Sequence, residues 1–197
     1  MRLTMRNLIR RTRTQPRHTE RAATPRRSTR PSRSRANHYR NSGPHPELLL
    51  VCSPGGHLLE LLSLRSAWKP FSRAWVTLDS DDTRSLLRSE RVFFARGPTE
   101  RNALNFLLNL VIAWRVIGEL RPAVVVSTGA AIAVPFAWVG RLRGTRVVYV
   151  ESLTRIDSPS LTGRLVMPVA DRIYVQWPQL VGRVRRARFA GSIFADA

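Results

Sequence analysis

Residues 47–57 read Glu-Leu-Leu-Leu-Val-Cys-Ser-Pro-Gly-Gly-His, an unbroken apolar run that gives way to a glycine-rich loop. A short apolar run bounded by turn residues predicts a strand that is buried on both faces. The glycines then allow a tight turn, and His57 opens a predicted helix that extends to residue 67. Strand, glycine loop and helix in this order are the start of a parallel α/β unit.

The same alternation continues along the chain and predicts the fold class. Strands are expected at 47–52, 74–78, 92–95, 123–127, 146–150 and 172–175, with helices at 57–67, 82–89, 100–120, 129–141 and 161–170. Pro122 ends the long third helix, and Pro135 predicts a break or kink in the fourth. The pattern predicts an α/β, Rossmann-like parallel sheet with helices on both faces, in which ligands bind at the carboxyl ends of the strands.

The loop after the first predicted strand, 53–57, has the features of an anion site. The consecutive glycines Gly55 and Gly56 let backbone N–H groups approach a ligand at the positive end of the following helix, which suits a phosphate or diphosphate. His57 is a candidate general base, since a histidine titrates near neutral pH. A tight turn whose histidine merely caps the helix is the alternative.

Two further loops follow strands four and five. Ser127, Thr128 and Gly129 are small residues with hydroxyls that can bond a ligand. In the loop at 151–155, Glu151 can accept bonds from sugar hydroxyls or orient the histidine of the first loop, and Arg155 can pair with phosphate. A structural Glu151–Arg155 ion pair is the alternative. We expect the three loops to converge on one edge of the sheet and to form a crevice for a phosphorylated ligand.

The net charge of +20 is concentrated at the start of the chain. Residues 1–46 contain 13 arginines and one acidic residue, with almost no aliphatic clusters, so we expect a disordered arm ahead of a globular domain at 47–197. Three roles are compatible with the arm: a solvated tail, contact with an anionic membrane surface, or nucleic-acid binding. The last ranks lowest, because nothing in 47–197 supports it.

The remaining composition limits the chemistry and the location. Cys52 is the single cysteine, which excludes an intrachain disulfide, and its apolar surroundings predict a buried thiol. Asp79, Asp81 and Asp82 follow the second strand and are interpreted as helix-capping residues, not as a metal site. We find no convincing membrane span or signal peptide and expect the cytoplasmic side. The apolar helix at 102–120 is interpreted either as a core helix or as an interfacial helix that inserts Phe106, Leu107, Leu110 and Trp114 into lipid.

Several ordered motifs together resemble one family. They are SPGGH (53–57), STGA (127–130), ESLTR (151–155), SLTGRL (160–165), PVAD (168–171), YVQWP (174–178) and GSIF (191–194). In this order they resemble the membrane-associated subunit of bipartite UDP-N-acetylglucosamine transferases. That family covers the dolichol-linked oligosaccharide enzyme and bacterial capsule and exopolysaccharide homologues. The match extends from about residue 48 to 194 and leaves the arginine arm uncovered.

The resemblance implies the N-terminal, acceptor-binding half of a GT-B glycosyltransferase divided between two chains. A small partner subunit would bind the UDP-sugar, and the acceptor would be a polyprenyl-diphosphate-linked saccharide. The transfer would be inverting, without a metal or other cofactor. The loop at 53–57, with Ser53 and its two glycines, would hold the acceptor diphosphate, with His57 as the base.

The resemblance also implies roles at the other two loops. Thr128 and Gly129 would form the second ligand-binding loop. Glu151, a catalytic candidate together with His57, would line the acceptor site with Ser152 and Arg155. Eukaryotic relatives carry an N-terminal membrane anchor, where this chain has its arginine arm. The alternative function is a non-catalytic membrane scaffold that recruits and activates the catalytic glycosyltransferase subunit.

Overall fold

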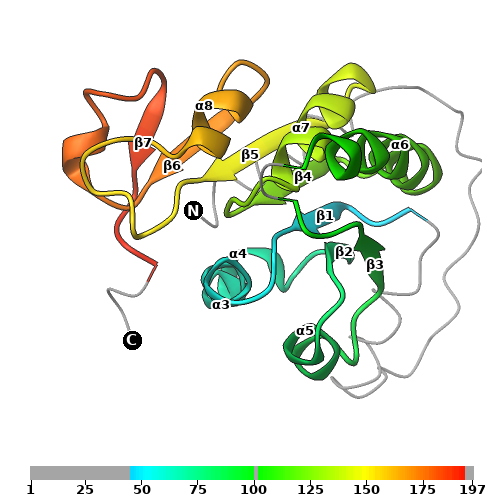
Figure 1. Cartoon of the computed structure of the whole chain (residues 1–197). Coiled ribbons are helices and arrows are strands. Elements are labelled where there is room, and N and C mark those ends of the chain that lie inside the picture. Colours follow the sequence, from blue (N-terminus) through cyan, green and yellow to red (C-terminus); the bar gives the residue numbers. More distant parts are fainter. Residues whose placement is uncertain (1–44, 100–101, 194–197) are drawn as a thin grey trace, which may run out of the picture.

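The computed structural model describes residues 45–99 and 102–193. Its centre is a seven-stranded sheet in the order β3-β2-β1-β4-β5-β6-β7, in which every neighbouring pair is parallel (Figure 1). The strands are β1 (Leu48–Val51), β2 (Arg73–Leu78), β3 (Val92–Ala95), β4 (Val124–Ser127), β5 (Arg146–Val150), β6 (Arg172–Val175) and β7 (Ala187–Phe189). The predicted fold class is therefore confirmed.

The helices form two layers, one on each face of the sheet (Figure 1). One layer holds α3 (Gly56–Ser63), α4 (Arg65–Trp68) and α5 (Asp81–Leu86). The other holds α6 (Ala103–Leu120), α7 (Ala133–Leu142) and α8 (Leu161–Val166). A short 3₁₀ helix, Pro178–Leu180, precedes β7.

Alternate residues of the central strands face opposite layers. In β1, Leu48 and Leu50 belong to the cluster under α3 and α4, whereas Leu49 and Val51 pack with α6 and α7. All four are fully buried. This explains why the strand is apolar at every position, because both faces of a parallel sheet are covered.

The six predicted strands are present, and one strand was missed. β7 is a three-residue edge strand with the sequence Ala-Arg-Phe, of which Arg188 and Phe189 are exposed. It lacks the apolar run that marks the inner strands, and only its pairing with β6 defines it.

The predicted break at Pro135 is wrong. The helix at 129–141 was expected to begin at Gly129, but α7 begins at Ala133, because Gly129 and Ala130 have φ values of 128° and 68° that no α-helix can use. Pro135 is consequently the third residue of α7, where its missing N–H would have no intrahelical partner in any case. Pro122 follows the end of α6 as predicted.

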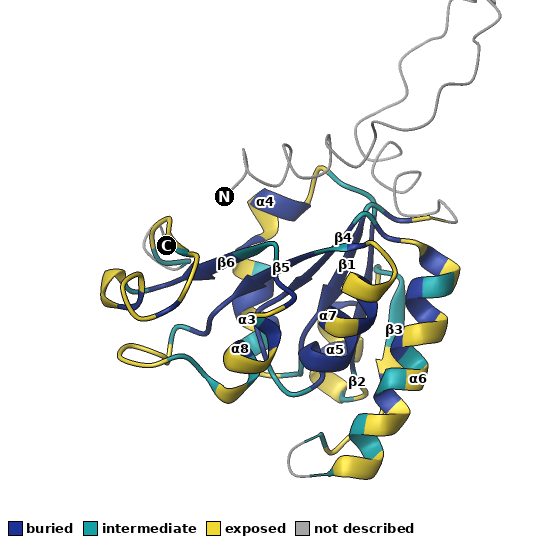
Figure 2. Ribbon diagram, turned by 90° about the horizontal axis from the view of Figure 1, so that it is seen from above, coloured by how far each residue is buried: buried dark blue, intermediate teal, exposed yellow. Residues whose placement is uncertain are grey.

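The helix α6 is not a fully buried core helix, which was one of the two predicted alternatives. One of its sides, including Ala113, Ile117 and Leu120, is buried against the sheet, while the other carries a row of exposed apolar side chains. Figure 2 shows buried and exposed segments alternating along its ribbon. Of the four residues predicted to face lipid, Leu107 and Trp114 are exposed, whereas Phe106 and Leu110 pack against the core. The length and apolar composition of α6 would allow it to cross a membrane, although the core helix of a soluble protein can have the same length and composition. Only 28% of α6 is buried inside the protein.

The expected arm lies almost entirely outside the described residues. His45 and Pro46, which were assigned to it, pack on the globular part: His45 Nδ1 lies 3.2 Å from the carbonyl oxygen of Leu120, and Pro46 is buried. Cys52 is buried as predicted, and its burial raises the pKa of the thiol to about 12. The thiol is therefore neutral and inert at ordinary pH.

Candidate functional site

The three predicted loops meet at the carboxyl edge of the sheet, where β1, β4 and β5 are neighbours. We call residues 53–57, 127–131 and 151–155 the loop cluster. The Thr128 hydroxyl donates to the carbonyl oxygen of His57 at 2.7 Å, which joins the first and second loops. The first and third are joined through Glu60 of α3, which accepts from the Ser152 hydroxyl at 2.8 Å and from the Leu153 N–H at 2.9 Å. The predicted convergence of the loops is confirmed.

The first loop presents open backbone at the start of α3. Gly55 has a φ of 77°, and no side chain caps the helix. A Cβ atom placed on Gly55 or Gly56 would meet nothing within 4 Å, and both residues are exposed. Because the first N–H groups of a helix have no intrahelical acceptor, this end of α3 has free donors and space in front of them.

His57 lies between the first and second loops. Its ring is pressed against Gly129, where an added Cβ would come within 2.7 Å of Cε1 and 3.0 Å of Nδ1. The side chain remains 30% exposed. Gly129 is therefore needed for two reasons: its φ of 128° disfavours any other residue, and its missing side chain makes room for the imidazole.

Glu60 is the site residue that the sequence reasoning missed. It is buried, and its Oε2 lies 3.5 Å from Nδ1 of His57. Neither of these two atoms has a hydrogen-bond partner among the described residues. The sequence spacing could have indicated this contact, because Glu60 follows His57 by three positions. Residues three apart on a helix lie on the same face.

Glu151 does not take the predicted position beside His57; Glu60 does. Glu151 is almost completely buried, and its carboxylate accepts from the backbone N–H groups of Ser152 and Ser160 and from the Tyr149 hydroxyl. Burial and the nearby Glu151 carboxylate raise the pKa of Tyr149. Gly163 passes so close to Glu151 that a side chain there would overlap it. Glu151 is thus turned toward α8 and away from a position where a sugar could reach it.

The hydroxyls of the loop cluster are mainly used inside the protein. Thr128 is fully buried and bonded to the first loop, and Ser152 is buried and bonded to Glu60. Ser127 Oγ accepts from the Gly129 N–H at 3.1 Å. Ser53 is half-buried, with its hydroxyl 3.4 Å from the carbonyl oxygen of Pro54. These residues hold the loops in place, which differs from the ligand contacts expected of Thr128 and Ser152.

Arg155 is exposed in the third loop, and the described residues provide no ion pair between it and Glu151. The structural pair considered from the sequence is therefore absent from this part of the chain. A guanidinium that is not engaged by a carboxylate is available to an anion at the same edge.

The aspartates after β2 form a helix start, as predicted. Ser80 caps α5 by accepting from the Thr83 N–H, and Asp81 and Asp82 lie in the first turn. Asp79 pairs with Arg84 at 2.6 Å, and the hydrogen bonds from that guanidinium lower the pKa of the Asp79 carboxyl. Within 45–99 and 102–193, no three His, Cys, Asp or Glu side chains are grouped as metal ligands.

Known structures share this architecture. The MurG structure of Acinetobacter baumannii superposes with a TM-score of 0.60 at 16% identity, covering 77% of this chain and 48% of that one. A UDP-N-acetylglucosamine 2-epimerase from Rickettsia bellii gives 0.60 at 12% identity, covering 77% and 46%. The chain thus spans about half the length of these structures. At such identities the likeness concerns the fold, which is the Rossmann-like half of a GT-B protein.

Sequence relatives define the group more narrowly. The model of the family "Oligosaccharide biosynthesis protein Alg14 like" matches residues 101–193. The UDP-N-acetylglucosamine transferase subunit ALG14 of Candida albicans is 38% identical over 169 residues, covering 74% of this chain and 77% of the relative. Its Schizosaccharomyces pombe counterpart is 30% identical over 173 residues, covering 74% and 82%. The chain belongs to the Alg14 family.

Proposed function

We propose that this chain is the acceptor-binding subunit of a two-chain glycosyltransferase. It would act in the transfer of a sugar from a UDP-sugar to a saccharide linked to a polyprenyl diphosphate. The relatives are named as subunits of a UDP-N-acetylglucosamine transferase, and the described part of this chain contains a single Rossmann-like sheet. The second half of a GT-B active site, which binds the UDP-sugar, would come from a small partner chain.

The observation that carries the proposal is the open start of α3 beside His57. Backbone N–H groups of the first helical turn and the positive end of the helix dipole favour a diphosphate at Gly55 and Gly56. Arg155, exposed at the same edge, would pair with the same group. A lipid diphosphate held there places the first saccharide residues next to His57.

His57 would act as the general base. The carboxylate of Glu60 faces Nδ1, so Nδ1 would carry the proton and Nε2 would be the acceptor. Nε2 would take the proton of the acceptor hydroxyl as that oxygen bonds to the anomeric carbon. The bond between the anomeric carbon and the UDP oxygen breaks, and UDP leaves against the partner chain. Attack opposite to the leaving group gives inversion.

Glu60, Thr128, Gly129, Ser152 and Glu151 would support this arrangement without contacting the acceptor. The first four fix the backbone and ring of His57, while Glu151 fixes the start of α8. A buried carboxylate with satisfied hydrogen bonds suits a structural role better than proton transfer. We therefore assign Glu151 to positioning, in place of the catalytic role expected from the sequence.

We further propose that the protein works at the cytoplasmic surface of a membrane, where a polyprenyl acceptor resides. The exposed apolar row of α6 supports a peripheral attachment. The acceptor would belong to lipid-linked oligosaccharide or to capsule and exopolysaccharide synthesis. No metal or organic cofactor is required by the proposed steps, since the UDP-sugar is itself the donor substrate.

The test is reconstitution of the purified chain with its partner, a UDP-sugar and a polyprenyl-diphosphate-linked acceptor. His57→Ala should lower the transfer rate about a hundredfold or more, which is the usual contribution of a general base. His45→Ala is the matched control, because His45 lies at the other edge of the sheet, against Leu120; it should stay within about twofold of the unmodified pair.

Two outcomes would contradict parts of the proposal. Sustained transfer by this chain without a partner would overturn the two-chain arrangement. If His57→Ala retains the rate while Gly56→Leu abolishes it, the base role is wrong and diphosphate binding remains. Gly182→Leu controls for the second variant, since a Cβ at Gly182 also meets open space.

A further inference from the structure

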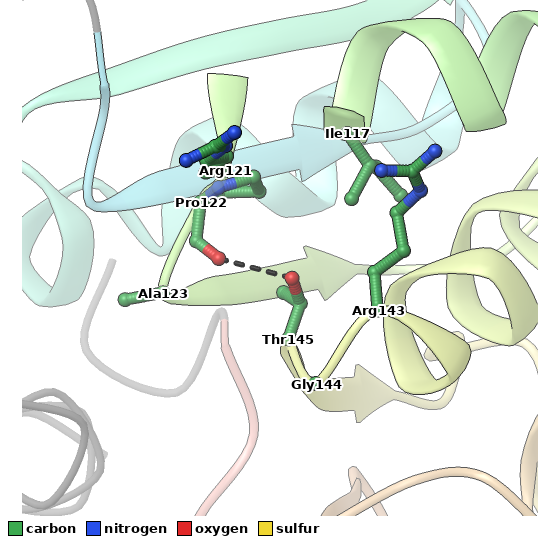
Figure 3. Close-up of a pocket in the computed structure, with 7 residues that line it drawn as sticks. All are labelled: Ile117, Arg121, Pro122, Ala123, Arg143, Gly144 and Thr145. Carbon is green, nitrogen blue, oxygen red and sulfur yellow. Dashed lines mark hydrogen bonds between the residues drawn. The ribbon is translucent and has the colours of Figure 1, made fainter. Parts of the chain in front are cut away.

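An open groove lies at the edge of the sheet opposite to the loop cluster. It has a volume of about 690 Å³ and is bordered by the end of α6 and by the segments that lead into β4 and β5 (Figure 3). Its lining residues are Ile117, Arg121, Pro122, Ala123, Arg143, Gly144 and Thr145. The Thr145 hydroxyl donates to the Pro122 carbonyl at 3.1 Å and ties the two segments together.

Arg143 lies along one wall of this groove, with its guanidinium over an aromatic ring. Its guanidinium carbon lies 3.9 Å from the ring centroid of Trp114. The guanidinium also lies close to Gly118, where a Cβ would come within 3.0 Å of Nη1. An aromatic ring and a bare stretch of helix thus favour one position of the exposed guanidinium without fixing it.

Two arginines border the groove, and neither is neutralised within 45–99 and 102–193. Arg121 follows α6 in a left-handed conformation with a φ of 45°, and no described carboxylate pairs with it or with Arg143. Figure 3 shows their side chains on either side of the groove. Guanidinium groups are well suited to binding the oxygens of a phosphate.

The groove is continuous with the apolar side of α6. The exposed apolar row consists of Leu104, Leu107, Leu108, Val111 and Trp114. These residues recur at helical spacing and extend over about 15 Å of the helix. The row ends at Trp114, which is 52% exposed and whose ring contacts Arg143. The apolar surface therefore leads directly to the cationic groove.

We propose that this groove binds the phosphate of an anionic phospholipid, with the acyl chains lying along the exposed row of α6. A free phosphate would use the two arginines but leave the apolar row uncovered. A zwitterionic headgroup would bring a cation close to Arg121 and Arg143. An anionic lipid would pair its phosphate with the two arginines and cover the apolar row with its acyl chains. Basic pockets beside membrane-facing helices are known to bind lipid headgroups in this way.

Calorimetric titration of the full chain with monomeric dihexanoyl phosphatidic acid tests the proposal. Dihexanoyl phosphatidylcholine and glycerol 3-phosphate, titrated separately, distinguish the anionic lipid from a neutral lipid and from a free phosphate ester. We expect the phosphatidic acid to bind at least about tenfold more tightly than either, because only it uses both surfaces. The double variant Arg121→Asn, Arg143→Gln should weaken its binding about tenfold or more, and asparagine tolerates the left-handed backbone at 121.

The control variant loses the same number of positive charges, but at positions away from the groove. Arg88→Gln with Arg185→Gln removes two exposed arginines from other parts of the molecule and should change the affinity less than about twofold. An equal loss in this control would mean that general charge attraction, and not the groove, binds the lipid. Glycerol 3-phosphate binding as tightly as the lipid would overturn the lipid part of the proposal.

A second variant covers the case in which the double variant unfolds. Arg143→Lys retains the charge but loses the planar stack on Trp114, and we expect an affinity between those of the unmodified chain and the double variant. Thermal unfolding of each variant shows whether the fold is intact. An unchanged affinity in Arg143→Lys and in a folded double variant would show that the groove is not the site.

Discussion

The two edges of the sheet carry different kinds of hydrogen-bond donor. At the carboxyl edge the donors are backbone N–H groups at the start of α3, and His57 is fixed by contact with Gly129 and by the buried Glu60. At the amino edge the donors are the exposed arginines Arg121 and Arg143. The first arrangement would hold a ligand through backbone groups of fixed geometry, which suits the proposed catalytic role. The second would supply charge on side chains that can move, which suits the proposed attachment to a lipid.

Among substitutions that test this difference between the two edges, Gly129→Ala is expected to have the largest effect. The new Cβ would overlap the His57 ring, and alanine would be strained at a φ of 128°. We expect the reconstituted transfer rate to fall about a hundredfold, because small displacements of a catalytic group have such effects. The free energy of unfolding should fall by about 1–3 kcal/mol. Steady-state kinetics and urea unfolding measure the two. An unchanged rate would show that the position of His57 is unimportant.

A smaller effect is expected from Glu60→Gln. Glutamine keeps an oxygen for the Ser152 hydroxyl and the Leu153 N–H but removes the negative charge beside Nδ1 of His57. We predict that kcat falls about tenfold while the KM of the acceptor changes little, which is the pattern of a group that acts only on the transition state. Glu119→Gln, exposed on α6, is the control. A rise in KM with unchanged kcat would instead assign Glu60 to acceptor binding.

The smallest effect is expected from Gly118→Ala at the amino edge. Its Cβ would also meet a neighbour, but that neighbour is the end of a flexible arginine side chain, which can move aside. Alanine is more favourable than glycine inside a helix, so the free energy of unfolding should rise by up to about 1 kcal/mol. Urea unfolding of Gly118→Ala and Gly129→Ala, measured under the same conditions, compares the two edges directly. A destabilisation similar to that of Gly129→Ala would mean that the amino edge is as rigid as the carboxyl edge.

Most of the fold could be predicted because its strands are buried on both faces. Leu48–Val51, Val124–Ser127 and Arg146–Val150 are apolar over most of their length, so their positions were readable from the sequence. β7 was not, since an edge strand of three residues has no such pattern. The start of α7 was also misplaced, because the backbone conformations of Gly129 and Ala130 have no reliable signature in a sequence.

The site was predicted in outline and corrected in detail. Strand order placed the three loops together, since the carboxyl ends of parallel strands share one edge. Which acid faces His57 could not be decided in that way. Glu151 follows a strand directly, which made it conspicuous, but its side chain turns toward α8. Glu60 lies within a helix and resembled an ordinary surface glutamate until the packing of α3 against the third loop buried it.

The sequence by itself determined the alternation of strands and helices, the glycine loop before His57 and the family resemblance of the ordered motifs. These are local properties, fixed by hydrophobic period and by backbone freedom. Only the tertiary structure showed that Gly129 contacts the His57 ring and that Glu60, and not Glu151, faces His57. It also showed which side of α6 stays exposed. These features depend on contacts between residues distant in sequence or on the direction in which a side chain points. Both are determined by burial and hydrogen bonding, which exist only once the chain has packed.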